Sequence, residues 1–80
     1  MTLDDVNKRL RDAFLGWFPN AQWNYPSYDG ACWSADVELP RDARIGRGAV
    51  ERIAAGLGDA TFAFSWTDRG IACHVIWWAQ

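Results

Sequence analysis

Cys32, Cys73 and His74 are the residues whose types suggest chemistry first, because a thiol beside an imidazole can form a thiolate nucleophile. If the two hairpins predicted below lie side by side, Cys32 and His74 project onto the same face of a sheet. Against this, Cys73 points to the core in the predicted register, the face is flat, and no group supplies an oxyanion hole. A Cys/His enzyme is therefore the least favoured alternative, and we expect a protein that is not an enzyme.

Asp36 and Glu38 are a second candidate pair, since they alternate along one predicted strand and lie about 7 Å apart on the same face. Paired carboxylates serve as acid and base when burial separates their pKa values, and an open sheet face offers no such burial. Two interpretations remain: a solvated face, or an acidic patch that meets a basic partner.

Metal and cofactor chemistry find little support in the sequence. Two cysteines and one histidine are too few for a structural zinc site, which takes four Cys or His ligands. The chain contains no GxGxxG, GxxxxGK[ST], GxSxG or HExxH motif. A formal charge of −2 and a pI near 5.1 disfavour direct nucleic-acid binding. We expect no cofactor, no metal and no direct nucleic-acid contact.

Apolar residues at spacings of three and four predict a first helix from Leu3 to Trp17. A shorter pattern from Val50 to Leu57 predicts a second helix, which Gly58 closes.

Alternating apolar and polar residues predict the strands. A first hairpin around the turn sequence PSYDG is formed by residues 21–25 and 31–39. Tyr25 is one of the alternating apolar residues of its first strand. Residues 60–78 form a second hairpin around TDRG. Its predicted register pairs Trp66 with Ile71, Phe64 with Cys73 and Phe62 with Val75.

Six tryptophans dominate the aromatic content of the chain. Five are expected to face the core: Trp17, Trp23, Trp33, Trp66 and Trp77. Trp78 falls with Ile76 on the polar side of the last strand, and an exposed tryptophan beside apolar surface is typical of a binding hot spot. The alternative is that the end of the chain curls and packs Trp78.

The order helix, hairpin, helix, hairpin over 80 residues predicts a single globular domain, residues 1–80. We expect an α+β fold with two layers, in which two helices lie on one face of a four-stranded antiparallel sheet. No apolar run approaches the roughly 20 residues of a membrane helix, and the N-terminal residues are charged. We therefore expect a cytoplasmic protein with free thiols, no membrane association, and a monomer rather than a dimer.

The whole chain resembles the small anti-CRISPR proteins that bacteriophages and other mobile elements encode. The resemblance lies in size, acidic charge, absence of enzyme motifs, and the hairpin-rich pattern MTLDDVNKRLRDAF, SADVELP, TFAFSW and HVIWWAQ. Members of this group share no common motif, so no functional residue is carried over from them. The resemblance implies an inhibitor that binds a protein partner, a type I CRISPR surveillance complex, and blocks its binding of target DNA in the bacterial host cytoplasm.

The residues expected to bind the partner come from the predicted sheet face and, for Asp29, from the turn that precedes its longer strand. The acidic members imitate phosphates toward a basic surface, and Trp78 with Ile76 forms the anchor. The full set is Asp29, Asp36, Glu38, His74, Ile76 and Trp78. The main alternative function is a small bacterial accessory or immunity-type subunit that binds its partner through the same face or an edge strand.

Overall fold

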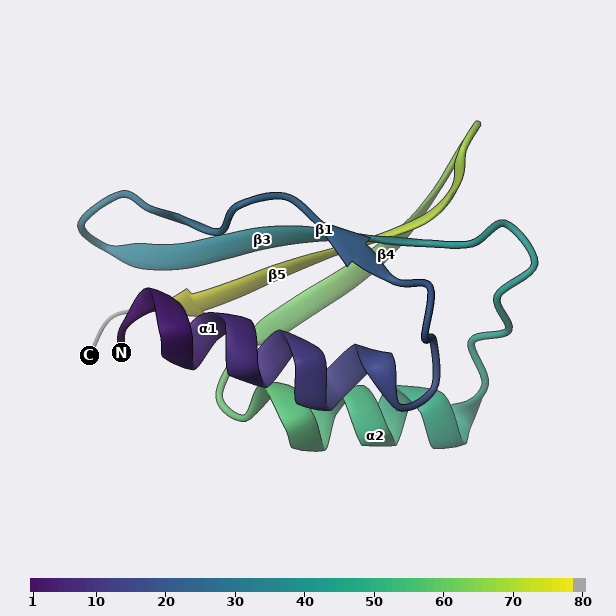
Figure 1. Ribbon diagram of the computed structural model, residues 1–80, viewed down its shortest axis with the longest axis horizontal. Helices are drawn as coiled ribbons and strands as arrows, with labels where there is room; N and C mark the ends of the chain where they lie inside the picture. The colour runs from purple at the N-terminus through teal and green to yellow at the C-terminus, as the bar shows by residue number, and fades with distance from the viewer. Residues whose placement is uncertain (79–80) are drawn as a thin grey trace.

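Two helices and an antiparallel sheet build an α+β fold, which confirms the predicted class. The computed structural model describes residues 1–78 (Figure 1). The elements in chain order are α1 (Leu3–Leu10), η1 (Arg11–Leu15), β1 (Gln22–Trp23), β2 (Ser27–Tyr28), β3 (Cys32–Leu39), α2 (Arg47–Leu57), β4 (Thr61–Thr67) and β5 (Gly70–Trp78). Figure 1 shows α1 and α2 on the same side of the sheet.

The sheet has the order β1-β3-β5-β4, and β2 also pairs with β3. The two central strands, β3 and β5, pair from Cys32 opposite Trp78 to Leu39 opposite Ile71. The register predicted for the β4–β5 hairpin is confirmed, since the three predicted pairs lie opposite one another. The two halves of the chain are therefore joined through β3 and β5, side by side at the centre of the sheet.

An interruption in the N-terminal strand explains why residues 1–78 form five strands and not the expected four. Residues 24–26 lie opposite residues 35–36 of β3, so the interrupted strand carries one extra residue between β1 and β2. An extra residue of this kind shifts the later side chains to the other face. Tyr25 lies within the interruption and is 80% exposed, so the alternation of its strand does not carry it into the core.

The first helix departs from α-helical geometry before it reaches Trp17. α1 is followed by the π-helical turn η1, whose wider turn changes which later residues face inward. Phe14 and Phe18 are buried, and the Phe18 N–H donates to the Phe14 carbonyl at 2.8 Å. Trp17 lies one residue off this line and is 54% exposed, so its predicted core position is wrong.

Trp66 is also wrongly predicted to be in the core, since it is 74% exposed. Figure 1 shows that the turn end of the β4–β5 hairpin bends away from the helices, so no helix lies close to it there. Gly70 closes this turn with a φ of 145°, and a Cβ at this position would lie 2.6 Å from the Leu39 carbonyl oxygen. The turn therefore requires glycine, as its sequence predicts.

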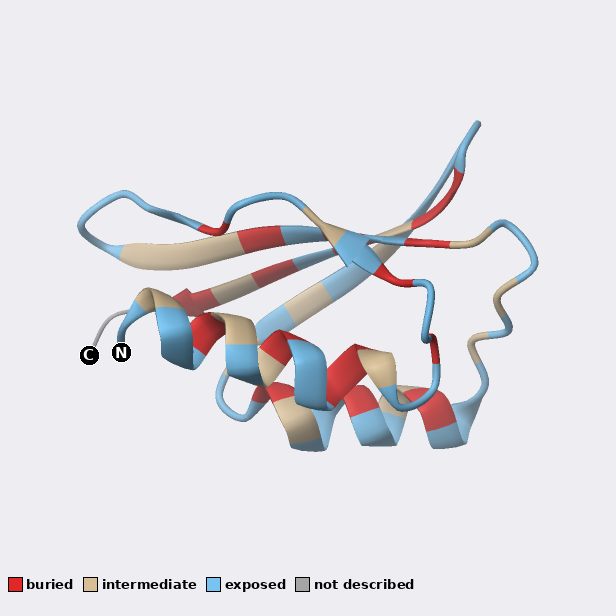
Figure 2. Cartoon of the chain, viewed as in Figure 1, coloured by how far each residue is buried: buried red, intermediate tan, exposed pale blue. Residues whose placement is uncertain are grey.

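The core lies between the helices and the sheet, where Figure 2 shows the buried segments facing one another. Trp77 is 2% exposed, and its indole Nε1–H donates to the Leu57 carbonyl at the end of α2, at 2.9 Å. The Arg9 guanidinium donates to the same oxygen at 3.2 Å. These two hydrogen bonds join α1, α2 and β5 at one helix terminus, whose carbonyl groups would otherwise lack partners.

A close contact between the helices fixes how they lie on the sheet. Gly56 of α2 faces Ala13 of η1, and a Cβ at position 56 would lie 2.6 Å from the Ala13 Cα. The same Cβ would lie 2.8 Å from the Ala13 backbone nitrogen. Because backbone atoms line both sides of the contact, a larger residue would push the helices apart.

We predict that Gly56→Ala lowers the free energy of unfolding by about 1–3 kcal/mol, because overpacking forces the helices apart. Gly48→Ala is the matched control, since its Cβ would meet a Trp17 side-chain carbon at an ordinary 3.7 Å. In that helical position alanine is expected to stabilise the protein by up to about 1 kcal/mol. Urea unfolding of both variants measures the difference. Equal stability of the two would contradict the close helix contact.

Candidate functional site

The face of the sheet that points away from the helices is the candidate site, and we call it the open face. Within residues 1–78, both helices lie on the opposite side (Figure 1). Five of the six predicted site residues lie on this face. Asp36, Glu38, His74 and Trp78 are exposed, and Ile76 is half-buried. Alternation along β3 and β5 therefore places these five residues on one face, as predicted, with Glu38 and Trp78 six strand positions apart, or about 20 Å.

Asp29 does not belong to the open face, because it lies in the turn between β2 and β3. Its Oδ1 accepts hydrogen bonds from the backbone N–H groups of Ala31, at 2.8 Å, and Cys32, at 2.9 Å. These two hydrogen bonds lower the pKa of the Asp29 carboxyl. The carboxylate holds the turn, which is a structural role that the sequence analysis did not assign to it.

Asp36 and His74 form a cross-strand pair at the centre of the open face. The His74 Nδ1 lies 2.5 Å from the Asp36 Oδ1, and both side chains are more than half exposed. A protonated imidazole would neutralise Asp36, whereas a neutral one leaves the face with the charges of Asp36 and Glu38. Glu38 lies opposite Ala72 and has no cross-strand cation.

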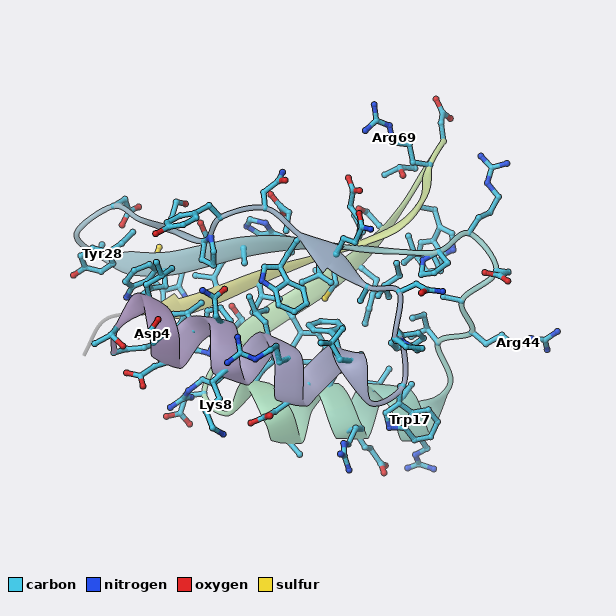
Figure 3. The ribbon with its side chains drawn as sticks, viewed as in Figure 1. Asp4, Lys8, Trp17, Tyr28, Arg44 and Arg69 are labelled. Carbon is cyan, nitrogen blue, oxygen red and sulfur yellow. The ribbon has the colours of Figure 1, made fainter. Side chains whose placement is uncertain are left out.

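No lysine or arginine on the described strands offsets the acidic charge of the open face. The other described strand residues on this face are small, polar or apolar: Gln22, Ser27, Cys32, Ser34, Thr61, Ala63, Ser65, Thr67, Gly70 and Ala72. Arg69, at the turn of the β4–β5 hairpin, lines a hollow of about 190 Å³ beside Glu38 (Figure 3). Positive charge therefore borders the face at the hairpin turn and not at its centre.

The opposite end of the open face is apolar. Trp78 is 61% exposed and lies opposite Cys32, and the next outward residue on its strand is Ile76, opposite Ser34. Residues 79–80, whose packing against Trp78 was the alternative, lie outside the described residues. The exposed indole agrees with the predicted position of Trp78 on the outward side of the strand.

A recess of about 570 Å³ lies next to Trp78 and was missed by the sequence analysis. Four aromatic side chains, one methionine and two opposite charges line it: Tyr28, Trp33, Trp77, Trp78, Met1, Arg9 and Asp59. The Tyr28 and Trp33 rings contact each other with centroids 5.1 Å apart. Because these residues come from separate elements, no local sequence pattern marks the recess.

The structure does not bring Cys32 and His74 together, although the enzyme alternative requires the two side chains to be close. Cys32 lies opposite Trp78, whereas His74 lies four residues away along β5, or about 13 Å by strand geometry. The Cys32 thiol instead donates to the Asp29 Oδ2 at 3.7 Å. Among residues 1–78, no three Cys, His, Asp or Glu side chains gather in a way that would hold a metal ion.

Both thiols are shifted away from the reactive thiolate form. Desolvation and the nearby Asp29 carboxylate raise the pKa of Cys32. Burial raises the pKa of Cys73 to about 12, and the Asp36 charge adds to this effect. A thiol with a raised pKa is a poorer nucleophile at neutral pH because less of it is ionised.

Comparison with known proteins finds no match: no known family, no curated protein and no solved structure matches this chain. Neither helix within residues 1–78 has the length and apolar character that crossing a membrane requires.

We predict that iodoacetamide modifies Cys32 more slowly in the folded protein than in the urea-unfolded chain, and Cys73 only after unfolding. The reason is the raised pKa of each thiol, which lowers its thiolate fraction at pH 8. Asp29→Asn removes the neighbouring charge, keeps an oxygen for the turn, and should speed modification of Cys32. Mass spectrometry of timed samples measures the rates. Faster modification of Cys32 in the folded protein would contradict this account.

Proposed function

We propose that this chain is a non-catalytic protein-binding inhibitor, which docks its open face on a basic surface of a protein partner. The observation that carries the proposal is the composition of that face. It combines two carboxylates, Asp36 and Glu38, with an exposed indole, Trp78, and its described strand residues include no lysine or arginine. Charge of one sign favours a partner surface of the other sign and speeds their encounter.

The two ends of the open face supply different terms of the binding energy. Carboxylates that remain partly solvated mainly give specificity and a faster association rate. Trp78 offers a wide apolar ring with Ile76 beside it, and buried tryptophans are among the residues that dominate interface energies. Because both ends lie on the strands β3 and β5, they are presented on a sheet and not on flexible loops.

The specific partner that we propose is a type I CRISPR surveillance complex, as the resemblance to anti-CRISPR proteins suggests. A surface that holds DNA is rich in lysine and arginine, which is the chemistry that Asp36 and Glu38 would meet. With a formal charge of only −2, the chain competes locally or blocks access, and does not imitate a whole DNA duplex. The inhibitor would then act in the bacterial cytoplasm. The alternative, an accessory or immunity-type subunit, uses the same face toward another protein.

The first test is binding of the tagged chain to purified type I surveillance complex, with and without target DNA. We predict capture that target DNA reduces. The variant Asp36→Lys with Glu38→Lys should bind about tenfold more weakly or worse, because like charges then face each other. Asp4→Lys with Glu51→Lys makes the same change of charge on the helices and should bind as the wild type does.

No capture by several type I subtypes would contradict the CRISPR partner. Capture that target DNA does not change would contradict competition at the DNA surface. Equal weakening by the two double variants would mean that overall charge, and not the open face, controls binding.

The second test separates the apolar anchor from the charges. We predict that Trp78→Ala weakens binding by about 30-fold, as expected for an interface hot spot. Trp17→Ala is the matched control, because Trp17 is also more than half exposed but lies beyond the first helix, on the other side of the molecule (Figure 3). Isothermal titration measures both affinities. Unchanged binding by the Trp78 variant would remove it from the interface.

A further inference from the structure

Strand β4 forms one edge of the sheet, and that edge has no strand partner within residues 1–78. It pairs with β5 on one side, and the sheet order ends at β4. No turn or loop backbone group of the described chain hydrogen bonds to residues 61–67 either. The N–H and C=O groups along the outer side of β4 are therefore available to another strand.

Edge strands of proteins that stay monomeric are usually short, charged, bulged or interrupted by proline. The opposite edge of this sheet follows that rule, since β1 and β2 have two residues each, with a bulge and Pro26 between them. In contrast, β4 has seven residues, TFAFSWT, with no charge, no proline and no glycine. Only one of the two edges is therefore open to pairing.

The sequence of β4 is symmetric in residue class about Phe64. An antiparallel copy centred on Phe64 would place like beside like, with Phe64 opposite Phe64 of the second copy. The remaining pairs would be Phe62 with Trp66, Ala63 with Ser65, and Thr61 with Thr67. Such self-complementarity is what a two-fold interface between identical chains requires.

The aromatic side chains of β4 are only partly buried in the single chain, so pairing of two β4 strands would bury more of their apolar surface. Phe62 and Phe64 are half-buried and pack edge to face with ring centroids 5.9 Å apart, and Trp66 is 74% exposed. In the symmetric pairing these rings would form cross-strand aromatic pairs, which stabilise antiparallel sheets. No like charges would be brought together, because β4 has none.

We propose that two copies of this chain pair antiparallel through β4, around a two-fold axis at Phe64, and form one continuous sheet. This dimer takes the place of the monomer expected from the sequence. Because residues that pair directly face the same way, the two open faces would lie on the same side of the joined sheet. The dimer would therefore present the Asp36 and Trp78 surface twice, in symmetric orientation. The inference rests on β4 and does not depend on the identity of any partner.

Sedimentation equilibrium of the purified chain over a range of concentrations tests the dimer, and two double variants test its register. Ala63 and Ser65 lie opposite each other across the proposed axis, and both are exposed in the single chain. Ala63→Lys with Ser65→Lys would place lysine opposite lysine twice and should weaken dimerisation by about tenfold or more. Ala63→Lys with Ser65→Glu would place opposite charges together and should keep the dimer.

Circular dichroism melting of each variant confirms that it is folded before its mass is interpreted. A dimer that the first variant loses and the second retains supports the proposal. A wild-type chain that stays monomeric at every concentration overturns it. Equal loss in both variants overturns the register, and masses that grow beyond two chains overturn the closed two-fold pairing.

Discussion

The backbones of α2 and η1 approach so closely at Gly56 that a Cβ there would lie 2.6 Å from the Ala13 Cα, and the rest of the structure depends on this contact. It lets two short helices form one compact layer, which covers one face of a small sheet. A chain of 80 residues has too little apolar surface to cover both faces. One-sided covering therefore decides which side chains become core and which become surface.

The separation into core and surface side chains is clearest along strand β5, at the centre of the sheet. Its inward residues Val75 and Trp77 are buried, while its outward residues His74 and Trp78 are exposed. The Trp77 indole is also hydrogen bonded to the end of α2, so the strand that presents the open face is anchored in the core. The candidate site is consequently as rigid as the sheet, which limits the entropy lost when a partner binds.

Alternation and helical spacing predicted the fold class, the β4–β5 register and five of the six site residues on the open face, because these follow from local periodicity. The errors have physical causes that periodicity does not contain. A π-helical turn displaced Trp17, and the turn end of the β4–β5 hairpin, which bends away from the helices, leaves Trp66 uncovered. The role of Asp29 in holding its turn was not predicted, because its hydrogen bonds to the Ala31 and Cys32 backbone depend on three-dimensional geometry. The aromatic recess beside Trp78 draws on residues far apart in the sequence, so it was not predictable.

One face of the sheet is packed and the other is open, and hydroxyl-radical footprinting of the free protein distinguishes this arrangement from a sheet covered on both faces. Mass spectrometry reads the modification of each residue along β5. We predict alternation, with Ile76 and Trp78 modified and Val75 and Trp77 protected until the protein unfolds. Equal protection of all four residues, or strong modification of Trp77, would contradict the one-sided arrangement and the binding face built on it.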